Sequence, residues 1–141
     1  MERMNRYLLD TNIWLERLLA QSQSETVGLL LDAVPTDRLL MSDFTLHSIG
    51  VILGRLKEST VFKQFVQDVL LDGEVSLIGL SPDAMHRLVA VMEHHQLDFD
   101  DAYQYVVAEQ EDAVIISFDA DFDRTERGRM SPAQVLATEK S

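Results

Sequence analysis

The stretch Tyr7-Leu8-Leu9-Asp10 places a carboxylate directly after a short apolar run. Similar short apolar runs occupy residues 39–41, 75–78 and 114–116. Each run is too short for a helix and is bounded by polar or turn residues, which is typical of buried strands. The sequence therefore predicts four strands, and Asp10 stands at the carboxyl end of the first.

The segments between these runs carry apolar residues at intervals of three or four, which predicts helices with one buried face. The sets are Val27, Leu30, Leu31 and Val34; Leu46, Ile49, Leu53 and Leu56; Phe62, Phe65, Val66 and Val69; and Met85, Leu88, Val89 and Met92. Residues 102–108 form a further helical stretch, and Ser42, Ser81 and Ser131 can cap helices at their N-termini. Strands that alternate with helices favour a mostly parallel sheet covered on both faces.

The composition favours one globular domain over residues 1–141 and excludes several kinds of site. The chain has 141 residues, with 12 basic and 24 acidic side chains and a formal charge of −12. Cysteine is absent, which excludes disulfides, zinc–thiolate sites, iron–sulfur clusters and cysteine nucleophiles. No apolar run reaches the roughly 18–20 residues of a membrane span, and the first residues lack the apolar region of a signal peptide, so we expect a cytoplasmic protein.

Several acidic or hydroxyl side chains follow the predicted strands. Because ligands bind beyond the carboxyl ends of strands in an open parallel sheet, these side chains are expected to share one edge. They are Asp10, Ser42, Asp43, Asp119 and Asp121, together with Asp101, which ends the acidic cluster 98–101 and lies at the first turn of the helical stretch 102–108. Each aspartate alone could simply cap a helix. Several carboxylates at one edge repel one another unless protons or a hard cation offset the charge.

Oxygen ligands without histidine or thiolate suit Mg²⁺ or Mn²⁺, which points to metal-assisted phosphoester chemistry. A calcium loop starting at Asp119 is excluded, because its sixth position is Arg124 and its twelfth is Met130. His94 and His95 are adjacent and point about 100° apart on a helix, so they do not form a zinc pair. The acidic surface would repel nucleic acid at long range unless part of the acidic excess binds a cation.

The order of these motifs resembles the PIN domain family, and within it the VapC-type toxins of toxin–antitoxin pairs. Leu8-Leu9-Asp10-Thr11-Asn12 resembles the first motif of the family, and Phe99-Asp100-Asp101-Ala102 resembles its third acidic motif. Residues 115–122, which contain Ser117, Asp119 and Asp121, are similar to the last acidic motif. Residues 131–136 resemble the closing segment. The matches together run from residue 8 to residue 136.

One position departs from the family pattern. The second motif of the family has a serine at the end of a strand and a glutamate six residues later. Ser42 matches the serine, but the glutamate position is Ser48. His47 lies about 100° around the helix from that position, and Asp43 could also donate a carboxylate. The sequence leaves open which of these three side chains faces the pocket.

The resemblance implies a three-layer α/β/α sandwich with a central, mostly parallel sheet of four to five strands. It implies a ribonuclease that binds Mg²⁺ or Mn²⁺, with RNA as substrate, a cognate antitoxin as partner and a homodimeric state. The implied metal ligands and catalytic residues are Asp10, Asp101, Asp119 and Asp121. The implied supporting residues are Thr11, Asn12, Ser42, Ser48 and Ser117, and the candidates for phosphate contact are Arg124, Arg127 and Arg129.

Two alternatives remain open at this point. Because Ser48 replaces an acid and the surface is acidic, the domain could be degenerate and bind RNA or protein without cutting. A metal-dependent phosphatase or a flap-type DNA nuclease is the other alternative. Restoring the acid with Ser48→Glu tests the first, and a comparison of RNA, matched DNA and a phosphomonoester tests the second.

Overall fold

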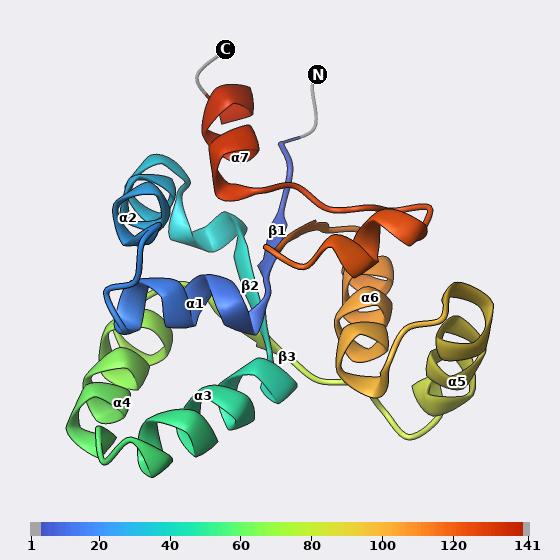
Figure 1. Cartoon of the computed structure of the whole chain (residues 1–141), viewed down its shortest axis with the longest axis horizontal. Helices are drawn as coiled ribbons and strands as arrows, with labels where there is room; N and C mark the ends of the chain where they lie inside the picture. Colours follow the sequence, from blue (N-terminus) through green and yellow to red (C-terminus); the bar gives the residue numbers. More distant parts are fainter. Residues whose placement is uncertain (1–3, 140–141) are drawn as a thin grey trace.

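In the computed structural model, which describes residues 4–139, four parallel strands form the central sheet in the order β3-β2-β1-β4 (Figure 1). The strands are β1 (Tyr7–Leu9), β2 (Leu39–Ser42), β3 (Ser76–Ile78) and β4 (Val114–Ile116). In the register, Tyr7 lies opposite both Leu39 and Val114. All four predicted strands are therefore confirmed, each to within one residue at its ends.

Seven α-helices connect and follow these strands in the described part of the chain. They are α1 (Thr11–Leu18), α2 (Ser24–Ala33), α3 (Asp43–Arg55), α4 (Ser59–Phe65), α5 (Ala84–His95), α6 (Phe99–Glu111) and α7 (Pro132–Glu139). A π-helical segment (Val66–Leu71) continues α4, and short 3₁₀ segments occupy Thr36–Arg38 and Ala120–Arg124. Among residues 4–139, no helix is long and apolar enough to cross a membrane.

Two of the three predicted N-terminal helix caps are confirmed. Ser42 caps α3, because its hydroxyl accepts a hydrogen bond from the Thr45 amide at 3.0 Å, and Ser131 similarly accepts from Gln134 at 3.2 Å. The prediction for Ser81 is wrong: a turn at residues 82 and 83 precedes α5, and it is the Ser81 backbone carbonyl that accepts from the Ala84 amide. Helix α6 begins at Phe99, three residues earlier than expected.

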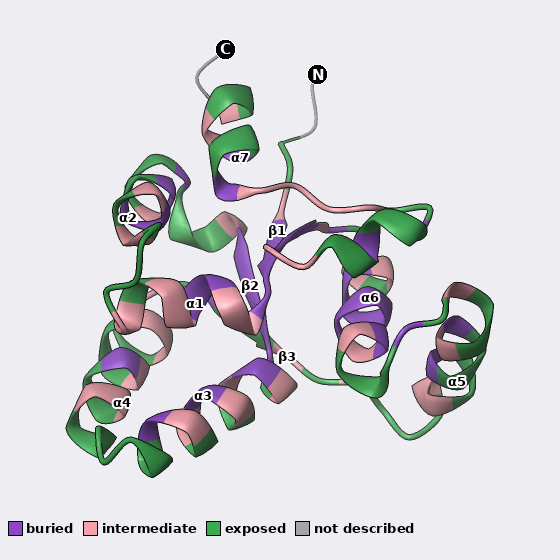
Figure 2. Cartoon of the chain, in the orientation of Figure 1, coloured by how far each residue is buried: buried purple, intermediate pink, exposed green. Residues whose placement is uncertain are grey.

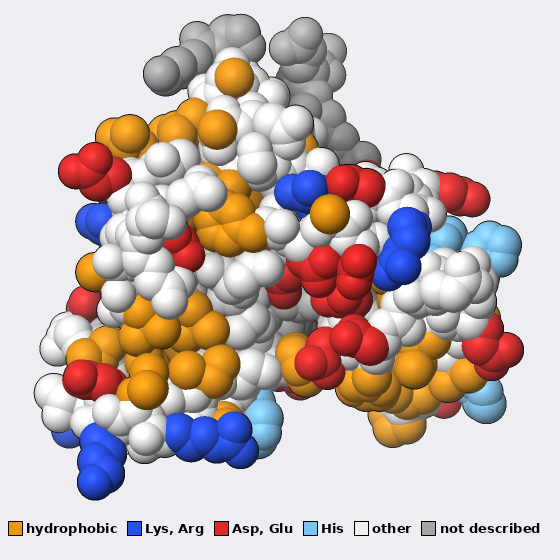
Figure 3. Space-filling model, in the orientation of Figure 1, with side chains coloured by type: hydrophobic (Ala, Val, Ile, Leu, Met, Phe, Trp, Pro, Cys, Tyr) orange, Lys and Arg blue, Asp and Glu red, His pale blue; other side chains and the backbone are white. Residues whose placement is uncertain are grey.

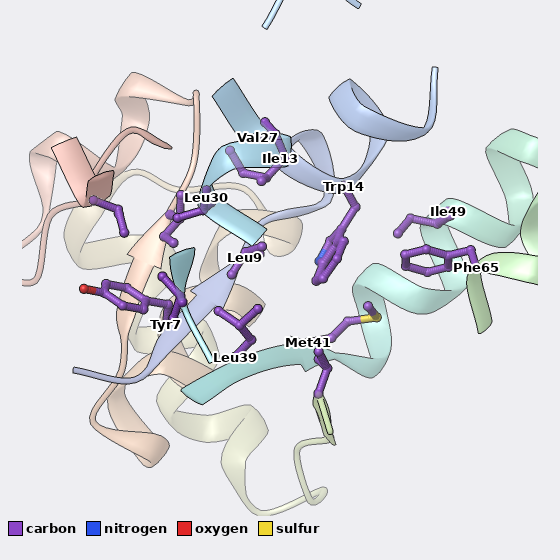
Figure 4. Close-up of a cluster of buried hydrophobic side chains, with 14 of the residues drawn as sticks. Tyr7, Leu9, Ile13, Trp14, Val27, Leu30, Leu39, Met41, Ile49 and Phe65 are labelled. Atoms are coloured by element: carbon purple, nitrogen blue, oxygen red, sulfur yellow. The ribbon is translucent and has the colours of Figure 1, made fainter. Parts of the chain in front are cut away.

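Alternation along the strands divides the core into two clusters, one on each face of the sheet. Tyr7, Leu9 and Met41 pack with α1, α2, α3, α4 and α7, whereas Leu8 and Ile115 pack with α5 and α6. Figure 2 shows β1, β2 and β4 largely buried between the two groups of helices, whereas β3 at the edge of the sheet is more exposed. Figure 4 shows the larger cluster. Each fully buried large apolar side chain contributes about 1.5–3 kcal/mol. The three-layer α/β/α sandwich is confirmed, with four strands.

The helices α1 and α3 start directly where β1 and β2 end, which fixes the position of the site. The Asp10 amide donates to the carbonyl of Ile116 at the end of β4, at 2.9 Å. Asp10 then caps α1 with its side chain, as Ser42 caps α3. The carboxyl ends of β1, β2 and β4 therefore bring their flanking side chains to one edge of the sheet.

Candidate functional site

Asp10 lies at the base of the site and is held by three donors. It is 8% exposed. Its Oδ1 accepts hydrogen bonds from the Thr11 amide at 2.8 Å and from Gln104 Nε2 at 3.0 Å, and its Oδ2 accepts from the Ser117 hydroxyl at 2.7 Å. Burial raises the pKa of the Asp10 carboxyl above its ordinary value, whereas these hydrogen bonds act to lower it. The side chain is therefore fixed in orientation before any ligand binds.

Three further aspartates converge beside Asp10. The carboxylate oxygens of Asp101, Asp119 and Asp121 lie within 4.8 Å of one another. Asp98 caps α6 by accepting from the Asp101 amide at 3.0 Å, which sets Asp101 in the first turn. The Asp119 amide donates to the Ser117 hydroxyl at 2.9 Å, and the Asp119 carboxylate accepts from the Asp121 amide at 2.8 Å. Local hydrogen bonds thus orient these carboxylates in two separate segments, the start of α6 and the loop after β4.

The cluster carries an electrostatic cost that a cation would relieve. Burial, followed by the adjacent carboxylate of Asp119, raises the pKa of Asp101 to about 8. In the absence of a cation, this cluster therefore favours retention of a proton at a higher pH than an ordinary carboxyl does. Figure 3 shows acidic side chains gathered near the middle of this face of the molecule. A set of oxygen donors that otherwise holds a proton fits a hard divalent cation such as Mg²⁺ or Mn²⁺.

A pocket of about 280 Å³ opens above these carboxylates, and of Asp43, His47 and Ser48 only Ser48 lines it. The lining residues are Asp10, Thr11, Asn12, Leu15, Phe44, Ser48, Ile52, Asp100, Asp101 and Asp119. Ser48 lines this pocket, whereas Asp43 and His47 line a different surface depression together with Phe62. The Tyr103 hydroxyl also donates to Asp43 at 2.7 Å. Asp43 and His47 therefore lie outside the pocket that contains Asp10.

The expected supporting residues form a hydrogen-bonded network under the pocket. The Thr11 and Thr45 hydroxyls lie 3.0 Å apart, and the Ser42 hydroxyl donates to Thr45 at 3.2 Å. The side chain of Asn12 donates to Ser117 at 3.4 Å. Four of the expected supporting residues thus join one network around Asp10, whereas Ser48 is placed only by its position in the pocket lining.

Two buried members of this network were not predicted from the sequence. Gln104 lies one turn after Asp101 on α6, and its amide contacts both Asp10 and Thr45. Thr45 lies three residues after Ser42, at the spacing of a capped first turn. A polar residue inside the otherwise apolar face of a predicted helix was the available signal for Gln104.

The three arginines that follow the last acidic motif are each paired with an aspartate. The pairs are Arg124 with Asp121 at 3.2 Å, Arg127 with Asp112 at 3.1 Å, and Arg129 with Asp123 at 3.2 Å. Arg129 also donates to the carbonyl of Ser117 at 3.1 Å, which fixes the loop after β4. Contact of these arginines with phosphate would therefore require them to leave these partners.

The fold is shared with proteins of known structure. A model of the PIN domain family matches residues 7–128. A toxin–antitoxin complex from Klebsiella pneumoniae contains a chain that is 21% identical, with a TM-score of 0.73 and coverage of 89% of this chain and 97% of that one. The sarcin–ricin loop cleaving toxin VapC20 from Mycobacterium tuberculosis is 18% identical, with a TM-score of 0.71 and coverage of 83% and 92%.

A third similar structure is FitAcB from Neisseria gonorrhoeae, which is 20% identical, with a TM-score of 0.70 and coverage of 90% of this chain and 98% of that one. No curated protein matches the sequence. At these identities the three structures share the fold with this chain.

Proposed function

The chain belongs to the PIN domain family, and on that premise we propose that residues 1–141 form one PIN domain that hydrolyses RNA phosphodiester bonds with Mg²⁺ or Mn²⁺. The observation that carries this proposal is the convergence of Asp101, Asp119 and Asp121 next to the buried Asp10. These four carboxylates would hold the metal. When bound, the ion supplies a Lewis acid and lowers the pKa of a coordinated water, which is the chemistry of phosphodiester hydrolysis.

The residues of the chain itself hold these carboxylates in place. Ser117 donates to Asp10 and accepts from the Asp119 amide, so one hydroxyl ties together the two strand ends. Asn12 accepts from the Phe118 amide at 3.3 Å and donates to Ser117, which braces the loop after β4. Such outer contacts typically change metal affinity or activity by about 10–100-fold when removed.

The choice of RNA as substrate is supported by the structural similarity to a toxin that cleaves the sarcin–ricin loop. The test is cleavage of a panel of structured and single-stranded RNAs with Mg²⁺ or Mn²⁺, alongside an EDTA control. Matched DNA and a phosphomonoester serve as comparison substrates. We expect cutting of RNA that EDTA abolishes. Cleavage confined to DNA or to the phosphomonoester would instead favour the flap-type nuclease or the phosphatase.

A second candidate function is a degenerate domain that binds RNA or a protein without cutting. The observation that favours it is the position of Ser48, rather than an acid, in the pocket. Replacing Ser48 with glutamate extends a further carboxylate into the pocket. We expect Ser48→Glu to strengthen Mn²⁺ binding by about tenfold or more, measured by isothermal titration calorimetry. A modest change in cleavage indicates an active wild type, whereas a gain from no cleavage indicates a degenerate one.

The neighbouring position provides the matched control for that experiment. His47 lies next to Ser48 in the chain but lines the other depression. His47→Glu adds the same carboxylate to the same helix and is expected to leave Mn²⁺ affinity unchanged. Equal affinities of the two glutamate variants would contradict the assignment of Ser48 to the metal pocket.

An apolar groove between α1, α2 and α4 supports an antitoxin as partner. It has a volume of about 310 Å³ and is lined mainly by apolar side chains, including Trp14, Leu18, Leu31 and Phe65. Figure 3 shows an apolar patch over α1 and α4. The chain resembles a member of a toxin–antitoxin complex, and an apolar segment of an antitoxin would bury this surface.

Co-purification with the product of the adjacent gene tests this partner. We expect the two proteins to copurify and Leu18→Asp to weaken the complex at least about tenfold, because the charge would be buried at the interface. Val89→Asp on α5 is the control, since Val89 is exposed away from the groove. Equal binding of both variants would contradict the groove as the docking surface.

Exposed apolar side chains on α2 and α3 also favour a homodimer. Leu29, Val51 and Leu56 are exposed on or beside these helices. Association through either helix would remove the exposed apolar side chains on that helix from water. Light scattering of the purified protein is expected to give the mass of two chains, and a mass of one chain at micromolar concentration would contradict the dimer.

A further inference from the structure

Gln104 is a buried amide on a helix face that is otherwise apolar. It is 1% exposed, and its neighbours Ala102, Tyr105 and Val106 belong to the core cluster between α6 and the sheet. Its Nε2 donates to Asp10 Oδ1 at 3.0 Å and to Thr45 Oγ1 at 2.7 Å. Its Oε1 is buried and has no hydrogen-bond partner among the described residues.

The partners of Gln104 do not need it in order to be satisfied. Thr45 has the hydroxyls of Thr11 and Ser42 within hydrogen-bond distance, and Asp10 accepts from the Thr11 amide and from Ser117. A buried acceptor without a partner is unfavourable and rare in native proteins. A local rule that is broken without a structural gain is typical of a functional site.

The Gln104 amide determines which oxygen of Asp10 has a free acceptor site. An ionised carboxylate has about four lone-pair sites, two on each oxygen. On Oδ1 the Thr11 amide and Gln104 occupy both, whereas on Oδ2 Ser117 occupies one. Among the described residues, no protein donor occupies the remaining site, which is on Oδ2.

We propose that Gln104 is a positioning residue. It occupies the second acceptor site on Oδ1 of Asp10 and so leaves Oδ2 as the oxygen that faces the cation. The Asp10 carboxylate at 3.0 Å fixes the orientation of the amide, because a carboxylate only accepts hydrogen bonds, and the same nitrogen also contacts the Thr45 hydroxyl at 2.7 Å. An amide rotated by 180° would place its oxygen against the carboxylate. This inference rests on the proposed metal-dependent function and adds a residue outside the four carboxylates.

The test compares Mn²⁺ binding and thermal unfolding of Gln104→Leu with those of the wild type, using the full chain. We expect Mn²⁺ binding, measured by electron paramagnetic resonance, to weaken by about 10–100-fold. The Tm in EDTA is expected to be unchanged or higher, because the substitution also removes the unpartnered Oε1. Gln110→Leu, at an exposed position of the same helix, is the matched control and should change neither quantity.

A second pair of variants tests the same contact from the other side. Thr45→Val removes the hydroxyl that holds the amide and is expected to weaken Mn²⁺ binding in the same direction, whereas Thr45→Ser retains it. Because both substitutions act through one contact, Gln104→Leu combined with Thr45→Val should weaken binding no more than the stronger single variant.

The outcomes separate this inference from the proposed function. If the wild type binds Mn²⁺ and both Gln104→Leu and Thr45→Val bind it equally well, the positioning role is overturned and the metal site stands. A lower Tm in EDTA with unchanged affinity would also overturn it, because that result describes a structural residue. Absence of Mn²⁺ binding by the folded wild type would overturn both.

Discussion

Replacing Asp10 with asparagine is expected to reduce metal-dependent RNA cleavage at least about 100-fold, because loss of a direct ligand exceeds the effect of losing a supporting contact. Asparagine keeps the size of the side chain but removes its charge. Asp10 is nearly buried and is held by Thr11, Gln104 and Ser117, and among the described residues no other carboxylate accepts from these donors. Single-turnover cleavage of RNA in Mg²⁺ or Mn²⁺ measures the effect.

Asp43→Asn is the matched control for that experiment. Asp43 follows β2 as Asp10 follows β1, but it accepts from the Tyr103 hydroxyl and lines the other depression. We expect Asp43→Asn to cleave RNA at close to the wild-type rate. Cleavage by Asp10→Asn at the rate of Asp43→Asn would contradict the proposed site.

Replacing Asp101 with asparagine is expected to stabilise the metal-free protein at high pH and to remove its stabilisation by Mn²⁺. The folded-state pKa of Asp101 is about 8, against an ordinary value of 3.8. Between these values the folded state holds a proton that the unfolded chain has released, so metal-free stability falls as pH rises from about 4 to about 8. Asparagine resembles the protonated acid and avoids this loss.

The expected gain in the free energy of unfolding at pH 8 is about 1–2 kcal/mol, since solvent screens a half-exposed carboxylate pair. For a chain of this size it corresponds to a rise in Tm of roughly 3–8 °C. Thermal unfolding at pH 5 and pH 8, in EDTA and in Mn²⁺, measures both effects. Asp32→Asn on α2 is the control, and an unchanged pH dependence in Asp101→Asn would contradict the origin of the shift.

The sequence by itself determined the strands and the edge at which the carboxylates lie. Short apolar runs at Tyr7–Leu9 and Val114–Ile116 predict strands. In a parallel sheet that helices cover on both faces, every residue of a strand is buried, so a strand is a short, continuous apolar run. Asp10 and Asp119 follow these runs, so the parallel direction of the strands was sufficient to bring them to one edge. The position of each aspartate after its strand is a local feature of the sequence. The shared edge follows from the parallel direction of the strands, which the alternation of strands and helices predicts.

Only the tertiary structure decided which of several nearby side chains face the pocket. Ser48 and His47 are adjacent, and the rotation of α3 against the sheet places Ser48 in the pocket beside Asp10 and His47 in a separate depression. Gln104 reaches Asp10 across a separation of 94 residues, which no spacing rule predicts. The pairing of Arg129 with Asp123 likewise depends on the path of the loop after β4. These features depend on how the helices pack and how the loops close. Packing and loop closure decide which side chains that are distant in the sequence come within contact of one another.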